Sequence, residues 1–452
     1  MIYYQVNKPT LEGLPAELHI CILHALSDPH SLWSLLRASP VYYYAFQLVK
    51  ESLLRRLLPK HYAGLVDIAD AIAAVRSKGL YAADPLNKGE IIALLDGRRR
   101  SDEIRQVRAK LSSSSSPGPL PDEPANVQET MQLLRLHNNA LFFLEDYCRT
   151  AKRPHWMEET RWDTEIQPRL VVGGLTATEK RRIFRAFYRL QIYANIFGSI
   201  ERTVDAKYSF ENNEWSEYYK RNTFRHREVW QLFFSTMTPW EVEEFSCLWE
   251  HCCYRCESIL GEVFDSLIQT GCKSLSELPP DQQAPDACCF ADCDDLDPDL
   301  NKENLASTGP ALLCKLLQEP QFLARRNLVL VNARGVVGHF YDSGFWPRPC
   351  DDPDDRVPPL LHPADRFDVF GANRTALRAL LRTLPPSERP NSLWEETWLS
   401  PSNYYYPEVF LDMFDCGPEN GDLQWQYALW DDERLIDWKV PRPGHWWYDD
   451  FP

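Results

Sequence analysis

Eight of the thirteen cysteines fall between residues 247 and 293, with His251 among them. A structural zinc site needs four thiolate or imidazole ligands, usually supplied as two close pairs. Cys253 and Cys256 have the spacing of one such pair, and Cys289 and Cys293 could supply the other. However, Cys252 and Cys256 also fall on the apolar stripe of an expected amphipathic helix, where free cysteine packs as a small hydrophobic residue. We therefore favour core packing over zinc, which stays the alternative.

Other chemical motifs are absent from the sequence. The acidic stretch 281–303 contains "DCDDLDPDLNKE", but it lacks the glycine that turns a calcium-binding loop. Glycine-rich phosphate loops, nucleophile elbows and paired-histidine zinc motifs do not occur either. We expect a protein that is not an enzyme and that holds no cofactor or metal.

Charge and composition indicate which kinds of partner and which cell compartment to expect. The net charge of −16 argues against nucleic-acid binding. The last part of the chain, residues 391–452, is acidic and holds seven of the 15 tryptophans. The first residues, "MIYYQVNKPTLEG", lack a basic start followed by an apolar core, so we do not expect a signal peptide, and no apolar run is long enough to span a membrane. We expect a cytoplasmic or nuclear protein with free thiols and no membrane partner.

Three prolines divide the start of the chain. Proline lacks a backbone N–H and has a fixed φ, so it fits the first turn of a helix and disrupts the interior. Pro15, Pro29 and Pro40 each precede a run of apolar residues at helical spacing. The pattern predicts a compact three-helix unit over residues 1–60.

The remaining sequence predicts a mainly α protein. Residues 61–111 read as a helical extension, and the serine- and proline-rich stretch 112–125 has the composition of a flexible linker. Residues 126–452 form an irregular, aromatic-rich helical region, with expected helix starts at Asn126, Thr176 and Thr238. The exceptions that we expect are the acidic loop 281–303 and one small β-hairpin at about 327–342.

The opening unit resembles an F-box. The resemblance rests on the sequence "LPAELHICILHALSDPHSLWSLLRAS" and on the spacing of nine residues: Leu14, Pro15, Leu18, Ile22, Leu23, Leu26, Leu32, Leu35 and Leu36. The tryptophan that many F-boxes carry in the third helix is absent. The form is similar to F-box-like proteins of filamentous fungi, which often carry a W-D-x-x-R-L-x-x-W element. Here this element is residues 430–438.

The resemblance implies a role in protein degradation. An F-box presents apolar side chains to the Skp-type adaptor of a cullin–RING (SCF) ubiquitin ligase, and the rest of the chain recruits a protein substrate, unknown here. The nine residues would then be adaptor contacts. In the alternative, the chain is a scaffold and the unit is an internal packing module. Periodicity does not separate the two, because both place the same leucines inside.

Overall fold

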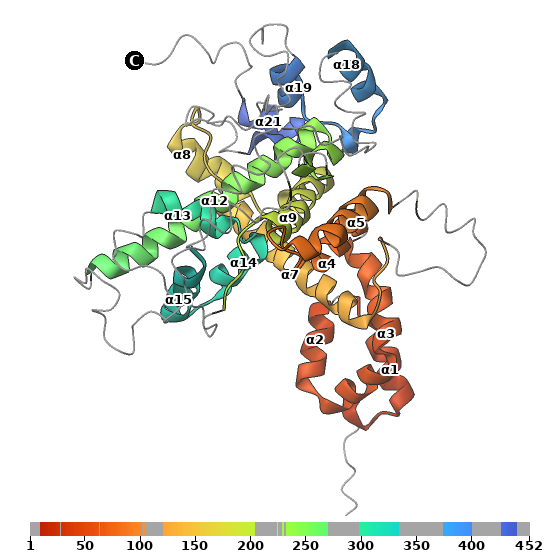
Figure 1. Cartoon of the computed structure of the whole chain (residues 1–452). Coiled ribbons are helices and arrows are strands. Elements are labelled where there is room, and N and C mark those ends of the chain that lie inside the picture. Colours follow the sequence, from red (N-terminus) through yellow and green to blue (C-terminus); the bar gives the residue numbers. More distant parts are fainter. Residues whose placement is uncertain are drawn as a thin grey trace, which may run out of the picture.

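A computed structural model gives the fold and describes residues 10–27, 29–62, 64–101, 104, 121–203, 224, 228–229, 232–269, 298–333, 374–399 and 426–440. These residues form helices and contain no strand, which confirms the expectation of a mainly α protein. In Figure 1 a lobe built from the first three helices projects from a larger helical body.

The lobe contains the three predicted helices, α1 (Ala16–Ala25), α2 (Pro29–Ala38) and α3 (Pro40–Tyr62). Pro29 and Pro40 are the first residues of their helices, and Pro15 directly precedes α1. Leu23 and Leu32 are fully buried and pack in one core with aromatic residues of α3. The buried residues of the lobe belong to the same hydrophobic cluster as those of the body, and α3 contributes to both.

The long helix α3 carries the chain from the lobe into the body. It continues past Pro59 to Tyr62, whose hydroxyl donates a hydrogen bond to the carbonyl of Leu133 at 2.9 Å. The Tyr188 hydroxyl reaches the Tyr62 hydroxyl at 3.3 Å, and His137 Nδ1 lies 3.1 Å from Tyr188 Oη. Burial raises the pKa of Tyr62, so this phenol stays protonated and acts as a donor. The lobe is thus joined to the body by buried hydrogen bonds.

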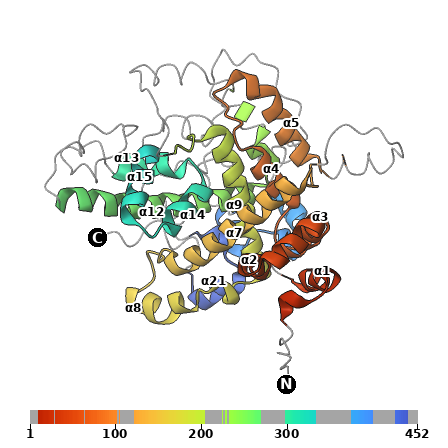
Figure 2. The same ribbon diagram turned by 90° about the horizontal axis from the view of Figure 1, so that it is seen from below.

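The body is an assembly of helices around α9 (Ala177–Phe197), in which 16 of 21 residues are buried. Figure 2 shows α9 among its neighbours. The helices of the body besides α9 are α4 (Ile68–Arg76), α5 (Lys88–Arg99), α7 (Val127–Thr150), α8 (Glu159–Arg161), α12 (Pro239–Gln269), α13 (Pro298–Ala306), α14 (Pro310–Gln318), α15 (Phe322–Ala333), α18 (Arg374–Thr383), α19 (Ser392–Leu399) and α21 (Asp432–Trp438).

The expected helix starts are present and have local causes. Asn126 accepts a hydrogen bond from the Glu129 N–H, and Thr176 with Glu179 forms a complete capping box. At the start of α12 only half of such a box forms, because Glu241 accepts from the Thr238 N–H at 3.0 Å. These caps satisfy backbone donors that the first turn of a helix leaves free.

A chain of buried ion pairs surrounds α9. Arg189 donates to Asp70 of α4 at 2.9 Å and pairs with Glu241 of α12 at 3.1 Å. Arg185 pairs with Glu241 and Glu244, both at 2.7 Å. Burial alone would raise the pKa of Asp70 and Glu241, but the neighbouring arginines lower both to about 2. Asp70 and Glu241 are therefore ionised, and each needs its arginine.

Two expected non-helical segments are helical where the structure describes them. Residues 327–333, the expected first strand of the hairpin, belong to α15, so the hairpin prediction is wrong there. The run "NLVLV" suggested a strand through its β-branched residues, but packing against neighbouring helices decides the conformation. Residues 298–303 of the expected acidic loop lie in α13. Residues 334–342 and 281–297 lie outside the described residues.

The end of the expected linker makes specific contacts. Asp122 is buried, and Arg76 donates to the carbonyl of Glu123 at 3.0 Å. The N–H of Ala125 donates to the carboxylate of Glu129. Residues 121–125 are thus held between α4 and α7, whereas residues 112–120 lie outside the described residues.

The ion pairs around α9 make a prediction about stability. We expect Arg185→Gln to lower the free energy of unfolding by about 3–5 kcal/mol, because Glu241 and Glu244 lose a buried partner. Arg55→Gln is the control, since Arg55 pairs with Glu51 at the surface and should contribute less than about 1 kcal/mol. Urea unfolding measures both variants. Equal losses in the two would contradict the assigned role of the buried network.

Candidate functional site

The nine residues of the F-box resemblance differ in exposure. Leu23, Leu32 and Leu36 are buried in the core of the lobe. Pro15 and Leu18 are exposed, while Leu14, Ile22, Leu26 and Leu35 are half-buried. A partner that binds the folded lobe can therefore contact Pro15 and Leu18 directly and the half-buried residues in part. The three buried leucines would instead hold the lobe in shape.

The lobe also exposes apolar residues outside this set. Thirteen large hydrophobic side chains are exposed among the described residues, and five of them lie within residues 11–48. The five, which we call the lobe surface set, are Leu11, Leu18, Tyr43, Tyr44 and Leu48. Tyr44 and Leu48, one turn apart on α3, are exposed by 71% and 75%. The lobe thus carries a larger share of the exposed apolar side chains than its length accounts for, and Tyr43 and Tyr44 are neighbours, with ring centroids 6.1 Å apart.

Sequence reasoning found only Leu18 of the lobe surface set. On α3, Tyr42, Ala45 and Phe46 face the core. Because side chains follow the helical period, Tyr44 and Leu48 then point outward, which is the pattern that could have identified them. The three consecutive tyrosines, 42 to 44, look alike in sequence. Only the tertiary packing shows that the first is buried and that the other two are exposed.

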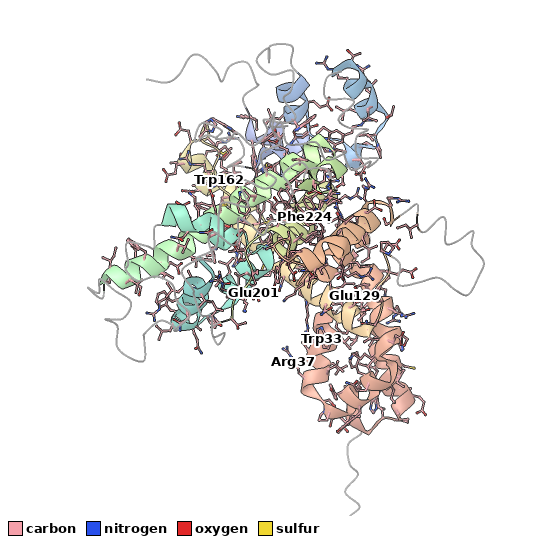
Figure 3. The ribbon with its side chains drawn as sticks, in the orientation of Figure 1. Trp33, Arg37, Glu129, Trp162, Glu201 and Phe224 are labelled. Carbon is pink, nitrogen blue, oxygen red and sulfur yellow. The ribbon has the colours of Figure 1, made fainter. Side chains whose placement is uncertain are left out.

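Polar and aromatic contacts fix the shape of the lobe. His19 Nε2 lies 2.9 Å from the carbonyl oxygen of Leu11, and the His19 ring packs edge-on against Tyr42 with centroids 4.8 Å apart. On α2, Trp33 packs edge-on against Phe46 at 6.0 Å, while the exposed Arg37 extends away from the ribbon (Figure 3). Because these contacts tie all three helices together, the lobe surface set is held on a preformed scaffold.

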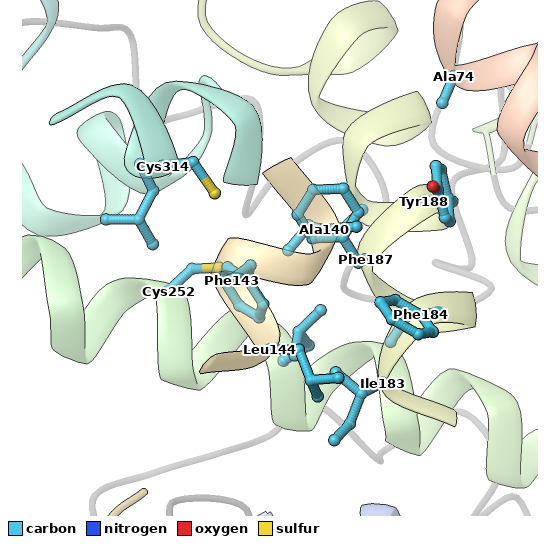
Figure 4. Packing of buried hydrophobic residues seen from close by; sticks show 14 of the residues in the cluster. Ala74, Ala140, Phe143, Leu144, Ile183, Phe184, Phe187, Tyr188, Cys252 and Cys314 are labelled. Carbon is cyan, nitrogen blue, oxygen red and sulfur yellow. The ribbon is translucent and has the colours of Figure 1, made fainter. Parts of the chain in front are cut away.

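The cysteines of α12 lie in the core of the body. Cys247, Cys252, Cys253 and Cys256 are all buried, and Figure 4 shows Cys252 and Cys314 near the aromatic residues of α7 and α9. Burial raises the pKa of Cys256 to about 12 and raises that of Cys253 as well, so both thiols are protonated. No group of three or more potential ligands gathers within the described ranges. Cys289 and Cys293, the other half of the zinc alternative, lie outside these ranges.

Two substitutions of Cys256 distinguish core packing from metal binding, because the two roles predict different losses of stability. If Cys256 packs as a hydrophobic residue, we expect Cys256→Ser to destabilise the protein by about 1–3 kcal/mol, because it buries a hydroxyl without an assured partner. Cys256→Ala should cost less than Cys256→Ser. A zinc ligand would make the two variants equally destabilising and would release zinc from both, which urea unfolding and metal analysis would detect.

His251 is a buried titratable group without a polar partner. Its side chain is fully buried, and neither ring nitrogen has a hydrogen-bond partner within the described part of the chain. The ring packs against Tyr147 at 4.7 Å and Phe143 at 5.7 Å. Burial, with a smaller effect from Arg255, lowers the pKa of His251 to about 3. The imidazole is therefore neutral in the folded protein at ordinary pH.

This depressed pKa predicts a pH dependence. Above pH 6.5 the histidine is neutral in both the folded and unfolded states, whereas between pH 6.5 and 3 only the unfolded state takes up the proton. We expect the protein to lose about 1.4 kcal/mol of stability at pH 5.5 relative to pH 8 through this residue. His251→Phe should lack this loss. A difference in unfolding free energy between the two proteins that does not change with pH would contradict the prediction.

Comparison with known proteins gives no assignment. The chain matches no family model, no curated protein and no solved structure. Among the described helices, none combines the length and the apolar character needed to cross a bilayer. The function of the protein is therefore inferred from its residues and their arrangement.

Proposed function

We propose that this protein is a substrate-recruiting subunit of an SCF-type cullin–RING ubiquitin ligase. The lobe would bind the Skp-type adaptor through the lobe surface set and the neighbouring half-buried leucines. The body would bind a protein substrate, and catalysis of ubiquitin transfer would belong to other subunits. In this proposal the protein is not itself an enzyme and acts in the cytoplasm, the nucleus or both.

One observation supports the adaptor-binding part most directly. The F-box spacing falls on a three-helix lobe that projects from the body and exposes more large apolar residues than its size would suggest. A few residues carry most of the binding energy at protein interfaces, and tyrosine, which supplies two members of the lobe surface set, is enriched among them. Leu18 belongs both to the F-box pattern and to the lobe surface set. Both the sequence pattern and the exposure of its side chain therefore support Leu18 as an adaptor contact.

Substitution of exposed lobe residues tests the proposal. We expect Leu18→Glu and Leu48→Glu each to weaken adaptor binding by at least about tenfold, because the interface would bury an unpaired carboxylate. Both side chains are exposed, so the lobe should stay folded, which circular dichroism would verify. Binding is measured by co-expression with a Skp-type adaptor and size-exclusion chromatography.

The matched control is Leu323→Glu, which places the same charge at an exposed leucine of α15 in the body. It should bind the adaptor like the unaltered protein. If the unaltered, folded protein forms no complex with the adaptor, the proposal fails and the lobe is a packing module of a scaffold. If Leu18→Glu and Leu48→Glu both bind normally, the assigned surface is wrong.

A further inference from the structure

Residues 426–440, which we call the C-terminal clasp, pack on the body as a separate short segment. The stretches on either side, 400–425 and 441–452, lie outside the described residues. The clasp contains a 3₁₀ turn at Tyr427–Leu429 and the helix α21. It includes the W-D-x-x-R-L-x-x-W element, and its contacts show how the body holds that element.

The two tryptophans of the clasp are its apolar anchors. Trp430 and Trp438 are buried, and their ring centroids lie 5.3 Å apart. Trp430 packs on Tyr147 of α7 at 5.7 Å. Trp438 packs edge-on against Trp162, labelled in Figure 3, at 5.8 Å. Both anchors are thus received by aromatic residues of the body.

Side chains of the body hold the backbone of the clasp. Arg182 donates to the carbonyl of Trp430 at 2.8 Å. Arg161 donates to the carbonyls of Asp437 and Trp438 at 3.1 and 3.0 Å. Asn391 donates to the carbonyls of Tyr427 and Trp430 at 2.7 and 3.0 Å. Bonds from side chains to main-chain carbonyls fix a segment in place without regard to its own sequence.

Other contacts depend on the side chains of the clasp. Arg434 donates to both carboxylate oxygens of Glu179, at 2.6 and 2.7 Å, and its guanidinium lies over the Trp430 ring. Asp431 pairs with Arg182 at 3.1 Å and also accepts a hydrogen bond from Thr176. A bidentate arginine–carboxylate pair is strong and geometrically selective. Position 436 is different, since Ile436 is 72% exposed and makes no such contact.

We propose that the surface formed by α7, α9, residues 161–162 and Asn391 is a peptide-recognition site, which the clasp occupies within its own chain. The ligand class is a peptide with the pattern Trp-Asp-x-x-Arg-Leu-x-x-Trp, and the site takes such a peptide from solution when the clasp is detached. Glu179 selects the arginine, Arg182 selects the aspartate, and Tyr147 and Trp162 receive the tryptophans. This inference does not depend on adaptor binding.

The test starts from the full folded chain with a specific protease site inserted after Gly417, which leaves α19 on the body and the clasp on the other fragment. After cleavage, we expect the two fragments to elute together. A fluorescent synthetic peptide of residues 426–440, added in excess, should then replace the C-terminal fragment, and fluorescence anisotropy would follow its binding. The Ile436→Ala peptide should bind equally well, whereas Arg434→Ala should bind at least about tenfold more weakly.

Three results would overturn the inference. In the first, cleavage unfolds the body, as measured by circular dichroism. In the second, the body keeps its fold but the added peptide never replaces the fragment. In the third, the Arg434→Ala and Ile436→Ala peptides bind alike, which would remove the assigned selectivity. Adaptor binding of the cleaved protein is a separate measurement and can fail or succeed independently.

Discussion

The structure of the body depends on keeping the arginines of α9 paired in a dry interior. Arg182, Arg185 and Arg189 lie three and four residues apart, so they follow one side of a helix that is almost wholly buried. Their carboxylate partners lie on three elements: Asp70 on α4, Glu241 and Glu244 on α12, and Asp431 in the C-terminal clasp. A buried charge without a partner is very costly, so α9 can occupy this place only when α4 and α12, which carry Asp70, Glu241 and Glu244, are in position.

The need to pair buried charges distinguishes the body from the lobe. Hydrophobic burial stabilises both, but buried ion pairs add directional constraints that fix how the elements of the body meet. The lobe is held by leucines, aromatic residues and the His19 contact. It meets the body where α3 ends, through the hydrogen bonds of Tyr62. The lobe surface can therefore be altered without disturbing the charge network, which makes it a suitable place for a partner.

Local features of the structure could be predicted from the sequence, and long-range features could not. Pro29, Pro40 and the Thr176–Glu179 pair determine helix starts through interactions within a few residues, and these helices were predicted. The pair of Asp70 with Arg189 joins residues 119 apart, and no sequence pattern points to it. The same limit explains the error at α15, where burial of Val329 and Leu330 overrides the preference of a β-branched run. For the candidate site, spacing found Leu18 but could not separate Tyr42 from Tyr44.

Arg182 contacts both the clasp and the buried ion pairs around α9. Release of the clasp from the body would therefore change the pairing of a buried charge. Without the clasp, Arg182 would lose Asp431 and the Trp430 carbonyl but would keep Glu244, whose carboxylate lies 3.7 Å from its Nε. Glu179 would lose Arg434 but would still accept the Thr176 N–H as part of its capping box. Arg182 and Glu179 therefore each keep one partner. Release would also expose the buried apolar side chains of the clasp, Trp430 and Trp438 among them, and a peptide with the same sequence would bury the same surface.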